Sequence, residues 1–131
     1  MGAECTYDYA VIRIVPRVER GEQINVGVIL SCVDAEFLAA RIELDEARLR
    51  ALDPAIDVEA VRSHLAMIET VCRGGVPAGP IGELPPRGRF RWLVSPRSTI
   101  VQMSPVHTGR TGNPEQALAN LVERMVRTES S

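Results

Sequence analysis

Three strand-like segments follow one another between residues 7 and 44, and only short connections separate them. Tyr7 to Val15 is rich in aromatic and β-branched residues and is followed by a proline, which cannot continue a ladder. Ile24 to Val33 is apolar on both faces except at two positions, as is typical of a central strand, and Gly27 inside it indicates a bulge or a close neighbour. Phe37 to Leu44 alternates apolar and polar residues. Because short connections join neighbouring antiparallel strands, these segments predict a meander.

Helices are predicted where an Asp or Asn that can cap a first turn precedes an apolar stripe with three- and four-residue spacing. Two segments meet this description, Val58 to about Arg73 and a segment that begins at Pro114, and a short helix capped by Asp45 is expected at Glu46–Leu52. The stretch from Gly74 to Gly88 is rich in Gly and Pro and is expected to form an irregular loop. Phe90 to Val94 could form a strand or a helix, and Ser98 to Ser104 has strand character.

Together these segments predict an α+β fold. We expect an antiparallel sheet of about four strands, made of a meander plus a late strand, with two to three helices packed on one face. The chain has 131 residues, the length of one ordinary domain, so residues 1–131 are expected to form a single domain with a frayed tail at 128–131. The longest apolar run is far too short to cross a membrane, and the N-terminus lacks the pattern of a secretory signal.

Residue counts exclude several kinds of chemistry. All fifteen basic residues are Arg, so the chain has neither a Schiff-base lysine nor the phosphate-binding lysine of P-loop proteins and kinases. Its two His residues cannot form a three-His zinc site. Its three Cys residues are widely spaced, so we expect buried, inert thiols and a reducing, cytoplasmic location. No metal site and no cofactor are predicted.

The charge is unevenly distributed along the chain. The formal net charge is −2, but the segment from Leu84 to Asn113 contains five Arg and no Asp or Glu, so the rest of the chain carries −7. Basic residues interleaved with aromatic residues can bind phosphates and stack bases, which makes part of this segment a candidate nucleic-acid surface. The candidate residues are Arg87, Arg89, Arg91 and Trp92. The favoured alternative is that the aromatic side chains lie in the core and their Arg neighbours face water.

A polar run from Ser104 to Gly112 leads to the cap of the last helix. Its hydroxyls, its glycines and Arg110 are typical of an anion site at a helix N-terminus, although a plain capped turn explains them equally well. His107 lies in this run beside two hydroxyl residues, but no nucleophile motif accompanies it. We therefore expect His107 to be a structural or ligand-facing hydrogen-bond donor, and His64, which borders an apolar stripe, to be structural.

Two motifs resemble those of a bacterial family. The first includes R-G-E-x-I-N-V-G-V-I-L, which ends at Leu30 and follows the segment Tyr7 to Arg13; the second includes S-P-R-S-T at 95–99 and Q-x-S-P at 102–105. On these motifs, and over nearly its whole length, the chain resembles the family catalogued as domain of unknown function 3037. The resemblance implies a small bacterial cytoplasmic protein without an assigned activity, and it suggests a persistence-type protein kinase as a partner.

If the first and last strands pair, the two motifs would form one polar pocket from distant segments. The candidate ligand-binding residues are Arg17, Arg20, Glu22, Asn25, Arg97, Ser98, Gln102, His107 and Arg110. We expect a binding or adaptor module for an anionic ligand or a partner protein, with nucleic acid as a less favoured ligand. The alternative is a hydrolase or phosphotransfer-related enzyme that uses Glu22, His107 and Arg97. The oligomeric state stays open.

Overall fold

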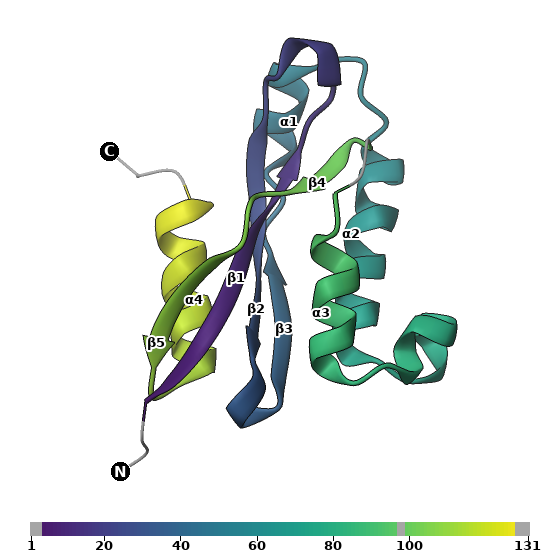
Figure 1. Cartoon of the computed structure of the whole chain (residues 1–131). Coiled ribbons are helices and arrows are strands. Elements are labelled where there is room, and N and C mark those ends of the chain that lie inside the picture. The colour runs from purple at the N-terminus through teal and green to yellow at the C-terminus, as the bar shows by residue number, and fades with distance from the viewer. Residues whose placement is uncertain (1–3, 97–98, 128–131) are drawn as a thin grey trace.

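A five-stranded antiparallel sheet forms the centre of the computed structural model, which describes residues 4–96 and 99–127 (Figure 1). The strands are β1 (Cys5–Ile14), β2 (Ile24–Cys32), β3 (Phe37–Ile42), β4 (Val101–Met103) and β5 (His107–Thr111). The first three form the predicted meander, in which β2 lies between β1 and β3. Both late strands pair with β1, β4 beside its C-terminal part and β5 beside its N-terminal part. The predicted α+β class and antiparallel sheet are therefore confirmed.

The fifth strand is the element that the sequence did not indicate. The residues of β5 belong to the polar run for which the sequence suggests an anion site or a plain capped turn, yet they pair with β1 from Cys5↔Thr111 to Tyr9↔His107. These five residues, H-T-G-R-T, lack the apolar alternation that identifies a strand, because their side chains are exposed or only half-buried. The strand forms because Pro105 ends β4 and the chain continues along the same edge of β1.

A β-bulge near Gly27 directs the apolar side chains of β2 to both faces of the sheet. Ile12 pairs with Gly27 and Arg13 pairs with Asn25, so Val26 is an extra residue in β2. A Cβ atom on Gly27 would lie 2.8 Å from the carbonyl oxygen of Arg41 on β3. Both expectations for this glycine, a bulge and a close neighbour, are thus confirmed.

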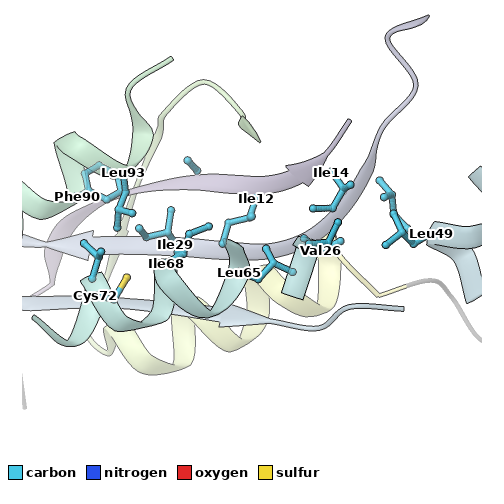
Figure 2. Close-up of a cluster of buried hydrophobic side chains, with 14 of the residues drawn as sticks. Ile12, Ile14, Val26, Ile29, Leu49, Leu65, Ile68, Cys72, Phe90 and Leu93 are labelled. Atoms are coloured by element: carbon cyan, nitrogen blue, oxygen red, sulfur yellow. The ribbon is translucent and has the colours of Figure 1, made fainter. Parts of the chain in front are cut away.

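Four α-helices cover the sheet. They are α1 (Glu46–Leu52), α2 (Val58–Arg73), α3 (Pro86–Val94) and α4 (Pro114–Met125). The first three pack with Ile12, Ile29 and Phe90 in one core (Figure 2), whereas α4 packs on the opposite face against Val28 and Leu30. Placing all helices on one face was therefore wrong for α4. The reason is that β2 is apolar on both sides, and each side needs a helical cover.

The Gly- and Pro-rich stretch is more ordered than predicted. Residues Val76–Glu83 form 3-10 turns, and α3 begins at Pro86, so only part of the expected loop is irregular. The strand-or-helix ambiguity at Phe90 to Val94 is resolved as helix. Further 3-10 turns at Val18–Arg20 and Val33–Ala35 connect the strands of the meander.

Three predicted helix starts are confirmed by their caps. The side chains of Asp45, Asp57 and Asn113 each accept a hydrogen bond from the backbone N–H three residues later, at 3.1, 3.1 and 3.2 Å. The spacing of Asn113 and Gln116 also predicts a capping box, but the Gln116 side chain donates to Oδ1 of Asn120 and does not complete it. Within the described residues, none of the helices has the length and apolar character needed to cross a membrane.

Candidate functional site

A hollow of about 450 Å³ lies between α2, α3 and β4. Apolar side chains form most of its surface: Met67, Ile68, Trp92, Leu93, Val101 and Met103. Polar residues contribute at Ser63, His64, Ser95, Thr99 and Gln102. A smaller hollow of about 70 Å³ adjoins it, because His64 and Val101 line both, and Ile100 belongs to the smaller one. Among the residues that the structure describes, no carboxylate lines either hollow.

The hollow exists because each of the three elements buries one apolar set in the core and leaves another at the surface. On α2 the stripe that contains Leu65 and Ile68 faces the core, so Met67, which lies off this stripe, is 52% exposed. On α3, Phe90 and Leu93 are buried while Trp92 is 37% exposed. Two large apolar side chains are therefore partly exposed at the wall of the hollow.

Three of the polar side chains around the hollow donate hydrogen bonds to nearby backbone carbonyl groups. The Thr99 hydroxyl donates to the carbonyl oxygen of Val101 at 2.6 Å, and the Gln102 amide donates to the carbonyl oxygen of Thr99 at 2.9 Å. The Ser95 hydroxyl donates to the carbonyl oxygen of Arg91 at 2.8 Å. Because these bonds hold the turn before β4 and the end of α3, the hollow has defined walls.

The predicted polar pocket is distributed over separate places in the structure. Arg17, Arg20 and Glu22 line a hollow of about 340 Å³ beside the end of α1, where Arg20 and Glu22 form an exposed ion pair at 2.9 Å. Asn25 donates to the carbonyl oxygen of Met125 at 3.0 Å and so joins β2 to the end of α4, while its own Oδ1 is buried without a partner among the described residues. These residues therefore lie away from the large hollow.

The candidates of the late segment are also dispersed. Gln102 lines the large hollow, whereas Arg110 lines a different one of about 320 Å³ beside α4 and approaches Glu4 at 3.7 Å. The ring of His107 contacts the ring of Tyr9, with 5.4 Å between their centroids. Arg97 and Ser98 lie outside the described residues. Of the predicted ligand-binding residues in the described part of the chain, only Gln102 borders the large hollow.

Two of the candidate nucleic-acid residues, Arg87 and Arg89, stabilise the fold. Arg89 is 8% exposed and donates to the carbonyl oxygens of Val71, Cys72 and Leu84 at 2.7, 2.6 and 3.0 Å. Arg91 is exposed and Trp92 lines the hollow, so the four candidates do not form one surface.

Arg87 ties α3 to the sheet. Its guanidinium lies 2.6 Å from Oδ2 of Asp8 and donates to Ser31 at 3.3 Å. It also lies over the ring of Phe90, 5.2 Å from the centroid. Burial acts to raise the pKa of Asp8, but the hydrogen bonds from Thr108 and Arg87 outweigh burial and hold the pKa below its ordinary value. Arg87 therefore acts in a structural ion pair.

The cysteine thiols of the described residues are buried or half-buried, and the pKa is raised for two of them. Burial raises the pKa of Cys72 to about 12, which keeps this thiol protonated, and Cys32 is also buried. Cys5 is half-buried, and chiefly its hydrogen bond with Cys32 raises its pKa. In residues 4–96 and 99–127, no group of three His, Cys, Asp or Glu side chains is placed to hold a metal ion.

Sequence reasoning missed most of the large hollow. Met67 and Ser63 received no role, and His64 was assigned a structural one, because residues of α2 were judged only by whether they lay on the apolar stripe. The available signal was Met67 itself, a large apolar residue placed off that stripe.

Comparison with known proteins gives one match. A family model described as "Protein of unknown function (DUF3037)" matches residues 9–126, which is nearly the whole chain. No curated protein and no solved structure matches.

Proposed function

The chain belongs to the DUF3037 family of proteins of unknown function, and from its own geometry we propose that it is a binding module which holds an apolar segment of a partner protein. The observation that carries this proposal is the large hollow between α2, α3 and β4. Its volume of about 450 Å³ lies within the range of roughly 300–1,000 Å³ that is common for ligand-binding sites. Its mostly apolar surface with a few polar groups is also typical of such sites.

The lining favours a protein segment over an anionic small molecule. Among residues 4–96 and 99–127 no Arg lines the large hollow, and most of this lining is apolar, which suits apolar side chains better than an anion. Trp and Met, both present and both partly exposed, are enriched where proteins bind one another. Met is also flexible enough to adapt to different apolar side chains.

The charges around the hollow favour a partner segment in which Asp or Glu residues flank the apolar side chains. In the described part of the chain no carboxylate lines either hollow, and the sequence from Leu84 to Asn113 contains no Asp or Glu. Arg91 lies one turn before Ser95 on α3, so its exposed guanidinium is close to the rim of the hollow. A segment with apolar side chains between Asp or Glu residues therefore fits this face. The persistence-type kinase that the resemblance suggests is a first partner to examine for such a segment.

The enzyme alternative has no assembled site among the described residues. Glu22 follows the end of β1 at Ile14, whereas His107 pairs with Tyr9. Five strand positions separate Tyr9 from Ile14, which is roughly 16 Å along β1. Acid–base catalysis requires groups within hydrogen-bond reach of one reacting atom, so these two residues cannot act together.

Peptides that bind the proposed site will bind Met67→Glu much more weakly than the wild type. The probes are short random peptides without Trp, selected by display on the wild-type protein. Trp92 is the only tryptophan in the chain and lines the hollow, so its fluorescence reports occupancy directly. We expect peptides rich in apolar and acidic residues, and a loss of affinity of about tenfold or more in Met67→Glu, because a carboxylate at this position would be desolvated beside apolar groups.

Val76→Glu is the matched control. Val76 is 92% exposed and does not line the hollow, so the same change in charge there should alter affinity by less than about twofold. Equal binding by Met67→Glu and the wild type would overturn the proposal, as would selected peptides that leave Trp92 fluorescence unchanged.

A further inference from the structure

We propose, on the basis of the proposed function, that the partner segment binds as an added β-strand along the open edge of β4 and places alternate side chains in the large hollow. The ligand class is thus an extended peptide with apolar residues at every second position. Three features of β4 support this mode of binding.

The first feature is the unpaired edge of β4. The N–H of Ser104 donates to the carbonyl oxygen of Val11, and the N–H of Val15 donates to that of Ile100, so β4 uses alternate residues to bond to β1. By this alternation Val101 and Met103 point their backbone groups away from β1. In the described part of the chain β4 pairs with no other strand.

The second feature is the position of the hollow relative to that edge. Val101, Gln102 and Met103 all line the hollow, although successive side chains of a strand point to opposite faces of the sheet. Contact with three consecutive residues indicates a hollow that borders the edge of the strand as well as one of its faces. Figure 1 shows that β4 starts close to one end of α2 and runs from there toward β5.

The third feature is the set of backbone donors and acceptors of β4 that could form hydrogen bonds with an added strand. The Thr99 hydroxyl already donates to the carbonyl oxygen of Val101. Among the described residues, three backbone groups that point away from β1 therefore have no hydrogen-bond partner. They are the N–H of Val101 and both the N–H and the carbonyl of Met103. Exposed strand edges of this kind are templates for another strand, and peptides that add to them gain affinity from the backbone and specificity from alternate side chains.

Backbone methylation of a selected peptide tests this mode. Methylating one amide nitrogen at a time removes a donor and leaves every side chain in place. An added strand points alternate amides at β4, so methylation should weaken binding by about tenfold or more at every second residue of the bound segment, and by less than about twofold at the residues between them. Affinity is read from Trp92 fluorescence.

The outcomes separate this inference from the proposed function. Peptides that change Trp92 fluorescence but show no alternating effect of methylation would overturn strand addition and leave the hollow as the binding site. Peptides that never affect Trp92 would overturn both.

A protein variant provides a second test. Met103→Pro removes the outward N–H but no hydrogen bond to β1, and proline is tolerated on edge strands. Met103→Ala removes the side chain alone, so strand addition predicts that Met103→Pro binds the peptide about tenfold more weakly than Met103→Ala. Should the proline variant fail to fold, amide hydrogen exchange of the wild type decides: the amides of Val101 and Met103 should become protected when the peptide binds, and unchanged exchange contradicts the inference.

Discussion

Arg89→Ala is expected to lower the free energy of unfolding by about 3–4 kcal/mol. The Arg89 guanidinium donates to three carbonyl oxygens, those of Val71, Cys72 and Leu84, and the side chain is 8% exposed. Alanine would leave buried carbonyl groups without a donor and remove a positive charge from the C-terminal end of α2, where the helix dipole favours one. Chemical denaturation followed by circular dichroism measures the change.

The geometry around Gly74 shows how closely this guanidinium is packed. Gly74 follows α2 with a positive φ of 74°, and a Cβ atom there would lie 2.8 Å from Cζ of Arg89. Glycine is thus required both by the backbone conformation and by the space that Arg89 occupies. Arg91→Ala is the matched control, because Arg91 is exposed on the same helix and should change stability by less than about 0.5 kcal/mol. Similar losses in the two variants would contradict the assigned role of Arg89.

Phe90→Ala is expected to destabilise the protein by about 3–5 kcal/mol, whereas Trp92→Ala should cost only about 1–2 kcal/mol. Phe90 is 1% exposed and packs in the core with α2 and the sheet, so its removal leaves a cavity. Trp92 is 37% exposed and lines the hollow, where truncation enlarges a space already open to solvent. Denaturation followed by circular dichroism compares both variants without relying on the tryptophan signal.

Binding should show the reverse order. Trp92→Ala removes a large apolar contact from the hollow and should abolish the binding of selected peptides, measured by calorimetry, at concentrations that saturate the wild type. Equal destabilisation by the two variants, or full peptide binding by Trp92→Ala, would show that both aromatic residues serve the core alone.

Local signals in the sequence were sufficient for much of the fold. A helix cap depends only on the capping residue and the three residues that follow it. The caps at Asp45, Asp57 and Asn113 could therefore be predicted from the sequence. The meander followed from short connections between apolar segments, and these depend on neighbours along the chain. The sequence did not reveal the side of the sheet on which α4 packs, because an amphipathic stripe specifies that a helix is buried without specifying its partner.

The candidate site was much harder to predict because it depends on distant contacts. The large hollow is formed by side chains of α2, α3 and β4, and no local pattern places Met67, Trp92 and Val101 beside one another. Likewise, the five Arg of the late segment suggested one positive surface, but Arg87 pairs with Asp8 on β1 and Arg89 binds the end of α2. Charge counted along a chain does not show which charges are neutralised in the folded protein.

The most direct test of the account is to map a selected peptide onto the protein by the backbone amide chemical shifts of the isotope-labelled chain. Binding in the large hollow predicts that the changes concentrate at Ser63 to Ile68 on α2, Trp92 to Ser95 on α3, and Val101 to Met103 on β4. If the changes instead gather beside α4 or at the connection between β1 and β2, while these three segments stay unaffected, the hollow is not the binding site and the central claim fails.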